Sequence, residues 1–190
     1  MKEFFGLLPV VLAIPSYALY IRAVVNHKTI PHMYSWLIWS VLALVGFLAQ
    51  IESNAGPGAW NTGVTSLACF IVFIVSIRYG EKHLSKIDAA LLALAIVAII
   101  TRVFTDDYTL ATSLATFAAL VGFTFTIKKA YNHPAQENQV TFNINFLRNL
   151  VSLFALSSIS YNTFFYPCMM MLANLAVVLV INVRTVAENT

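Results

Sequence analysis

The chain consists of long apolar stretches that charged residues, prolines and glycines interrupt at intervals. Runs such as 91–100 and 176–181 are continuously apolar, so the alternation typical of a membrane β-strand is absent. In lipid, only a helix or a closed barrel satisfies all of its backbone hydrogen bonds. We therefore expect seven helices, near Phe5–Val25, Tyr34–Ile51, Ala59–Ile77, Ile87–Thr101, Thr109–Ile127, Phe142–Ser157 and Phe164–Val183. The fourth is the shortest of these.

The amino-acid composition is that of an integral membrane protein. The 190 residues are 59% hydrophobic and only 10% charged, whereas soluble domains carry about a quarter charged residues. A membrane crossing takes roughly 20 residues, so the chain has room for seven. This composition excludes a disordered chain, a nucleic-acid binder and a disulfide-stapled secreted module. It predicts an all-α, multi-pass membrane protein.

The distribution of positive charge predicts the orientation, because lysine and arginine concentrate on the inner side of a membrane. With the N-terminus outside, the outer segments hold two basic residues, Lys2 and Arg102, and Arg148 remains within a span. The inner segments then hold eight: Arg22, Lys28, Arg78, Lys82, Lys86, Lys128, Lys129 and Arg184. We expect the N-terminus outside and the C-terminus inside.

Two local features have simple interpretations. A cleaved signal peptide would also explain Lys2, the apolar run after it and the small residues around Ala18. The repeat described next argues against cleavage, because it needs the first helix as the counterpart of the fifth. Counted from the inner ends of their helices at Arg78 and Arg184, Cys69 and Cys168 differ in depth by seven residues, which is about 10 Å of helix rise. They are too far apart for a disulfide and are expected to be small apolar fillers.

A shift of 106 positions aligns the two ends of the chain without a gap. It places Asn26-His27 on Asn132-His133. The same shift pairs Ser35 with Thr141, Trp36 with Phe142, Ile38 with Ile144, Val45 with Val151, Ala49 with Ala155, Trp60 with Tyr166, Val72 with Val178, and Arg78 with Arg184. The pattern predicts 3+1+3 parallel repeats, with bundles at 1–80 and 106–190 and a linker helix at 81–105.

Seven helices in this arrangement resemble the SWEET sugar transporters, the PQ-loop proteins and the nicotinamide riboside transporters. Four segments resemble an uncharacterised group of bacterial membrane proteins in that superfamily: Pro31-His-Met-Tyr-Ser-Trp-Leu-Ile-Trp39, Phe47-Leu-Ala-Gln50, Gly56-Pro-Gly-Ala-Trp60 and Arg78-Tyr-Gly-Glu81. The resemblance implies a transporter in the inner (cell) membrane whose two bundles rock around a central cavity. In SWEET transporters an asparagine at about the depth of Asn174 contacts sugar, which implies a ligand contact at Asn174.

The strongest candidate for chemistry is Arg148, the one full charge inside a span. Asn145, Arg148, Asn149 and Ser152 recur at positions i, i+3, i+4 and i+7, which places them on one helix face. A charged residue at this depth normally faces the bundle interior or a wet cavity. The alternative for Arg148 is that its side chain snorkels to the inner headgroups. The stripe favours a substrate-binding cavity.

Aromatic residues supply further candidates. Trp36 and Trp39 stand at i and i+3 on the second helix, and their indoles could stack on a sugar or heteroaromatic ring. An aromatic belt at the inner interface, or packing, is the alternative for both. For Asn174, the alternative to ligand contact is an interhelical hydrogen bond.

These features favour a transporter or facilitator of a small polar or anionic solute. The alternative is a membrane receptor or sorting protein on the same scaffold. No nucleophile–base pair, metal-binding motif or mid-span carboxylate occurs in the sequence, so we expect no enzymatic activity, no metal, no cofactor and no ion-coupled pumping. The expected partners are a small-molecule substrate and the lipid bilayer, with no nucleic acid; a homo-oligomer remains open.

Overall fold

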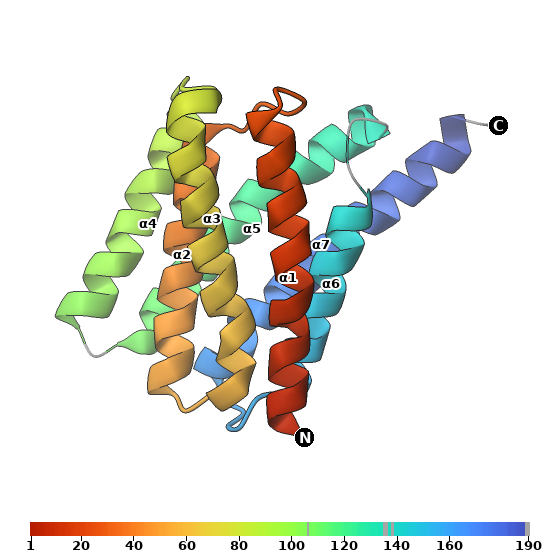
Figure 1. Ribbon diagram of the computed structural model, residues 1–190. Helices are drawn as coiled ribbons and strands as arrows, with labels where there is room; N and C mark the ends of the chain where they lie inside the picture. Colours follow the sequence, from red (N-terminus) through yellow and green to blue (C-terminus); the bar gives the residue numbers. More distant parts are fainter. Residues whose placement is uncertain (106, 135–136, 138, 189–190) are drawn as a thin grey trace.

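The computed structural model describes residues 1–105, 107–134, 137 and 139–188, and every regular element in these ranges is a helix. The helices are labelled in Figure 1. Their bounds are α1 Lys2–Val25, α2 Met33–Glu52, η1 Gly56–Ala59, α3 Trp60–Tyr79, α4 Lys86–Phe104, α5 Tyr108–Asn132, α6 Gln139–Phe154 and α7 Tyr161–Glu188. The prediction of an all-α protein is confirmed for this part of the chain.

One expectation about helix length is wrong. The fourth helix was expected to be the shortest, but α4 has 19 residues and α6 has 16. α4 is longer than expected mainly at its end, which lies at Phe104 instead of near Thr101. Its start lies only one residue before the expected Ile87, after a capping box in which the Ser85 hydroxyl accepts from the Asp88 amide and the Asp88 carboxylate accepts from the Ser85 amide. The chain leaves α6 early because the Ser157 amide donates to the Ala55 carbonyl, 2.8 Å away, instead of continuing the helix.

The seventh helix begins earlier than expected because of a cap. The Ser160 amide donates to the Thr163 hydroxyl at 2.8 Å, and the Thr163 amide donates to the Ser160 hydroxyl at 3.4 Å. This reciprocal pair satisfies donors that the first helical turn cannot pair. α5 has a simpler cap, in which the Asp107 carboxylate accepts from the Leu110 amide at 2.8 Å. Asp106 itself lies outside the described residues.

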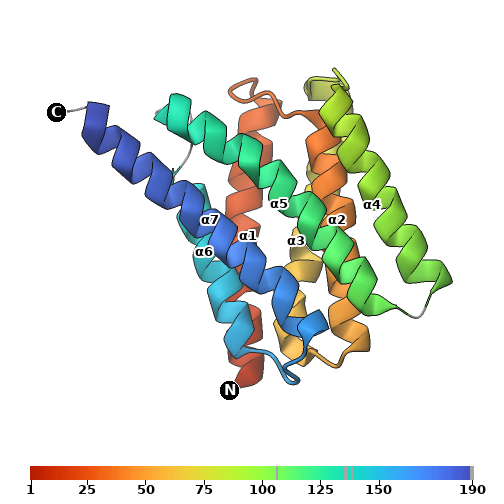
Figure 2. The ribbon, with the colours of Figure 1, turned by 180° about the vertical axis from the view of Figure 1, so that it is seen from behind.

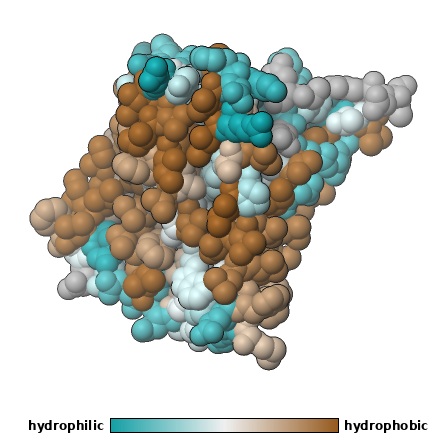
Figure 3. Space-filling view, viewed as in Figure 1, coloured by the Kyte–Doolittle hydropathy of each residue, from teal (hydrophilic) through white to brown (hydrophobic). Residues whose placement is uncertain are grey.

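Six of the helices are long and apolar enough to cross a membrane, namely all but α6. Large apolar side chains cover their outer faces, including Leu19, Leu67 and Phe117, each about 60% exposed or more. Figure 3 shows the result as apolar surface across the middle of the molecule, with hydrophilic residues gathered at its top and bottom. Such a surface is stable in lipid and unstable in water, so the chain is a membrane protein.

The helices pack in an ordered way. α3 lies between α1 and α2, and α7 lies between α5 and α6. The two groups meet where α1 packs against α6 and where α2 packs against α5, while α4 covers α2 and α5 (Figures 1 and 2). Successive helices run in opposite directions, so the chain begins at one end of the molecule and its last described helix finishes at the other (Figure 1). We call these the amino-terminal end and the carboxyl-terminal end.

At the amino-terminal end, the loop after α2 packs tightly against the loop after α6. We call this contact, made by Ala55, Gly58, Leu156 and Ser157, the loop junction. It holds the backbone hydrogen bond from Ser157 to Ala55, and a Cβ on Gly58 would lie only 2.9 Å from the backbone of Leu156. Nearby, the buried Gln50 side chain donates to the Thr163 carbonyl at 3.0 Å. The contacts across the loop junction therefore include backbone groups.

Candidate functional site

Arg148 lies on α6 at the place where α1, α3 and α6 meet, and only 2% of it is exposed. Its Nε donates to the Pro9 carbonyl on α1 at 3.1 Å, and its Nη2 donates to the Thr65 hydroxyl on α3 at 3.0 Å. Its Nη1 donates to the Asn145 side chain at 3.3 Å. The guanidinium therefore joins three helices, and it does not reach toward a membrane interface.

The other residues of the polar stripe on α6 lie beside Arg148, as their spacing predicts. Asn149 accepts from the Asn61 side chain on α3 at 3.2 Å, so a second polar contact joins α6 to α3. Ser152 is buried and donates to the Asn149 carbonyl on its own helix at 2.7 Å. The whole stripe faces the helices that precede residue 80. We call this set the polar junction: Asn61, Thr65, Asn145, Arg148, Asn149 and Ser152.

An aromatic residue on α1 completes the surroundings of the guanidinium. The Tyr17 ring centroid is 5.6 Å from the Arg148 guanidinium carbon, within the range of a cation–π contact. The Tyr17 hydroxyl is 3.9 Å from the Cys69 sulfur on α3. Sequence reasoning missed Tyr17, because nothing in an apolar helix distinguishes a tyrosine beside a cation from one in a packed core.

The two tryptophans of α2 point in different directions. The Trp36 ring lies 4.9 Å from the Tyr20 ring and 6.5 Å from the Tyr17 ring, so it adjoins the aromatic edge of the polar junction. Trp39 instead meets the Phe123 ring on α5 edge-on at 5.1 Å. Positions three apart differ by about 60° around a helix, which is enough to send these side chains to opposite neighbours.

Asn174 lies apart from the polar junction. It is buried on α7, and its Nδ2 donates to the Met170 carbonyl of the same helix at 2.7 Å. Its Oδ1 has no hydrogen-bond donor among the described residues. The structure therefore brings four of the seven predicted site residues together, Asn145, Arg148, Asn149 and Ser152, and places Trp36 at their edge and Trp39 and Asn174 elsewhere.

The positive charge of Arg148 has no opposite charge beside it in the polar junction. In the described part of the chain, Arg102 pairs with Glu52 and Lys129 pairs with Glu137, and the His32 ring lies 3.8 Å from the Asp88 carboxylate. None of these contacts involves Arg148. Every oxygen that accepts from Arg148 belongs to a neutral group. Taking a charge out of water is costly unless an opposite charge compensates it. The site is thus a buried cation with neutral partners.

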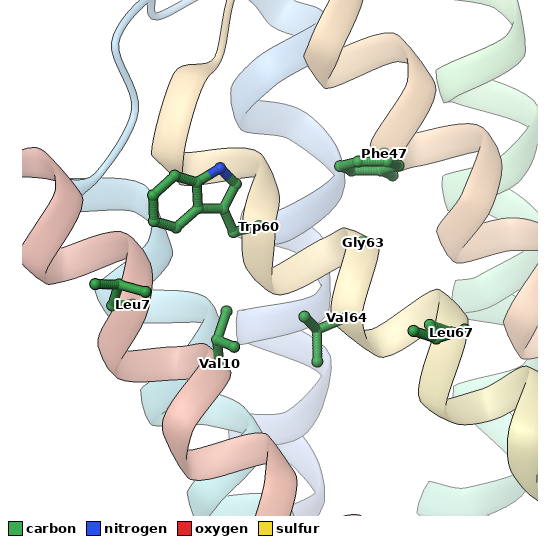
Figure 4. Close-up of a pocket in the computed structure, with 7 residues that line it drawn as sticks. All are labelled: Leu7, Val10, Phe47, Trp60, Gly63, Val64 and Leu67. Carbon is green, nitrogen blue, oxygen red and sulfur yellow. The ribbon is translucent and has the colours of Figure 1, made fainter.

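Figure 4 shows a groove elsewhere on the molecule. It has a volume of about 360 Å³ and is lined only by apolar side chains and a glycine: Leu7, Val10, Phe47, Trp60, Gly63, Val64 and Leu67. Leu7 and Leu67 are more than half exposed on the apolar surface. The groove therefore faces lipid, and none of the sequence-predicted site residues lines it.

The described residues hold no group of three or more metal-binding side chains, and both cysteines are free thiols. Comparison with family models, with curated proteins and with solved structures gives no match. The class that the fold and the apolar surface define is an α-helical, multi-pass membrane protein.

Proposed function

We propose that this protein is a transporter for a small polar or anionic solute, with seven spans and the N-terminus outside the cell membrane. The observation that carries the proposal is Arg148, a fully buried cation with neutral partners at a helix junction inside the membrane. Charged residues in such positions are expensive and typically mark substrate or ion pathways. A purely structural role would be served more cheaply by an apolar side chain of similar size.

An internal repeat is part of the proposal, and the helix boundaries support it. A shift of 106 positions carries the first residue of α1, Lys2, onto the first residue of α5, Tyr108. The expected repeat rests on sequence pairs, so these boundaries are independent support. The sixth span is α6, which has 16 residues and contains the buried Arg148.

Helix packing supports the same repeat. The neighbours of α3 are α1 and α2, and the neighbours of α7 are α5 and α6, which are their counterparts under the shift. The contact of α1 with α6 has the contact of α5 with α2 as its counterpart. A twofold axis along the membrane normal would exchange these contacts. Two bundles related in this way can rock against each other around a site between them, and Arg148 of the second bundle contacts Pro9 and Thr65 of the first.

The test is uptake by the purified protein in proteoliposomes. Sugars, carboxylic acids and vitamins are offered as radiolabelled solutes, with protein-free vesicles as the blank. We expect one solute class to enter saturably, and Arg148→Leu to reduce its entry at least tenfold. The matched control is Arg102→Leu, which removes an arginine paired with Glu52 at a helix end. If no solute enters faster than into protein-free vesicles, or if both variants behave alike, the proposal fails.

A further inference from the structure

The guanidinium of Arg148 has hydrogen-bonding capacity that the protein does not use. An arginine side chain carries five N–H donors. Three of them reach the Pro9 carbonyl, the Asn145 side chain and the Thr65 hydroxyl. The remaining two, one on Nη1 and one on Nη2, make no hydrogen bond of standard geometry to a described residue; the Tyr17 hydroxyl is the polar group on α1 that lies beside the guanidinium.

The charge of the site selects what kind of group that would be. Arg148 has no carboxylate partner in the described structure, and its surroundings are neutral oxygens and the Tyr17 ring. A carboxylate would supply both the missing negative charge and two acceptor oxygens that suit the planar guanidinium. A neutral sugar hydroxyl could accept a hydrogen bond but would leave the charge uncompensated.

A second unused polar atom, of the opposite kind, lies in the same junction. Asn61 is 2% exposed, its Nδ2 donates to Asn149, and its Oδ1 has no donor among the described residues. It stands one helical turn before Thr65, which accepts from Arg148, so both face α6. A buried acceptor without a donor is destabilising. A carboxylate has no proton to give it, but a hydroxyl has.

We infer that the polar junction binds a small hydroxycarboxylate, with the carboxylate on Arg148 and the hydroxyl donating to Asn61. This inference rests on the proposed function and names its substrate class. The carboxylate accepts from the two remaining N–H groups of Arg148, and the ligand hydroxyl pairs the Oδ1 of Asn61. One molecule would then supply an acceptor for the N–H groups of Arg148 and a donor for the Oδ1 of Asn61.

The test compares two probes that differ by one hydroxyl, lactate and propionate, with glucose as the neutral probe. Binding is measured by titration calorimetry on the purified protein in nanodiscs of phosphatidylcholine. We expect lactate to bind about threefold to tenfold more tightly than propionate, as one neutral hydrogen bond provides. Glucose should not bind. If lactate and propionate bind equally, the role of Asn61 is rejected; if glucose binds and neither acid does, the inference is overturned.

Three single variants test whether the acids bind at the polar junction. Arg148→Leu should weaken both acids about tenfold to a hundredfold, because it removes a charged donor. Asn61→Leu should leave propionate unchanged and reduce lactate to the affinity of propionate. Arg102→Leu should change neither acid. Equal binding of the acids to wild type and to Arg148→Leu overturns the inference, and thermal unfolding of each variant confirms that it is folded.

Two further arms separate the possible sources of failure. Anionic lipid headgroups could occupy Arg148 instead of a free acid, so the titration is repeated in nanodiscs that contain phosphatidylglycerol. Unchanged affinity for lactate supports a free carboxylate, and loss of binding overturns it in favour of lipid. Lactate that binds but does not enter proteoliposomes supports the inference and refutes the transport function. Saturable entry of a neutral solute that lactate does not inhibit leaves transport standing and overturns the inference.

Discussion

At the scale of single residues, Arg148 can be compared with Leu42, which the shift of 106 positions places on it. Leu42 is 1% exposed and belongs to an apolar core that includes Ala115 and Phe123 of α5. At this position α2 therefore contributes an apolar side chain to a core shared with α5, whereas α6 contributes a cation to its contact with α1. If both contacts serve only to hold helices together, leucine should serve as well at 148.

Arg148→Leu should therefore unfold at a temperature equal to or above that of the wild type, because a well-packed apolar residue often matches or exceeds a buried ion in stability. Arg148→Ala should lose about 2–5 kcal/mol, since it leaves a cavity among three helices. Thermal unfolding in one detergent, followed by intrinsic fluorescence, compares the two. Should leucine destabilise as much as alanine, the hydrogen bonds to Pro9 and Thr65 are themselves what holds α6 in place.

The residues of the polar junction were only partly predictable. Periodicity on α6 was sufficient to place Asn145, Arg148 and Asn149 on one face, because that relation is local to a single helix. Their partners Thr65 and Tyr17 come from helices more than 80 and 130 residues away in sequence, and no local pattern encodes such a contact. Trp39 and Asn174, the other candidates for ligand contact, lie away from Arg148. Spacing along one helix does not contain the inter-helix geometry that decides this.

At the scale of helices and loops, glycines set how closely the elements approach. A Cβ at Gly58 would lie 2.5 Å from a Leu156 methyl carbon and 2.9 Å from the Leu156 backbone. A Cβ at Gly122 would lie 3.4 Å from the Trp39 ring, which is ordinary contact. The two positions are therefore a natural pair for testing whether the loop junction is as tight as the structure shows.

Gly58→Ala should cost about 1–3 kcal/mol, because the backbone of the loop junction must move apart to admit a methyl group. Gly122→Ala is the control and should be neutral or slightly stabilising, because alanine favours a helix over glycine. Chemical unfolding of the two variants in matched micelles measures the difference. Equal effects at both positions would mean that the loop junction yields easily.

Helix ends show where local chemistry decides the fold and where it does not. Expected starts near 34 and 109 fall within one residue of α2 and α5, because caps such as Asp107 act within one turn. The end of α6 was misplaced by three residues, since it depends on a hydrogen bond from Ser157 to Ala55, about a hundred residues away in the chain. Boundaries fixed by tertiary contacts cannot be read from periodicity.

At the scale of the whole molecule, the distribution of basic residues predicts which end faces the cytoplasm. Single cysteines in a Cys168→Ala background test this, since Cys69 is buried. Ile159→Cys, at the amino-terminal end, should react with a membrane-impermeant maleimide on intact cells. Lys82→Cys, at the carboxyl-terminal end, should react only after the membrane is opened, because lysine and arginine are retained inside. The reverse pattern would show that the N-terminus is inside.

The last prediction concerns motion between the two proposed bundles. If solute enters by rocking of one bundle against the other, the loop junction at the amino-terminal end must open once in every cycle. Cysteines at Ala55 and Ser157, whose backbones share a 2.8 Å hydrogen bond, can form a disulfide across it. Oxidation of this double variant should then reduce uptake to the level of protein-free vesicles, and a reductant should restore it.

The control places a disulfide at a similar contact between the first bundle and the first residue of the linker that follows it. The Glu81 amide donates to the Pro31 carbonyl at 2.9 Å, and both residues precede α4 at the carboxyl-terminal end. Cysteines at Pro31 and Glu81 should cross-link to the same extent and leave uptake unchanged, because rocking moves these residues together. If the Ala55–Ser157 disulfide forms completely and uptake persists, solute does not pass the loop junction. Passage would then have to follow another route, and the polar junction around Arg148 would be a fixed support between helices that do not separate.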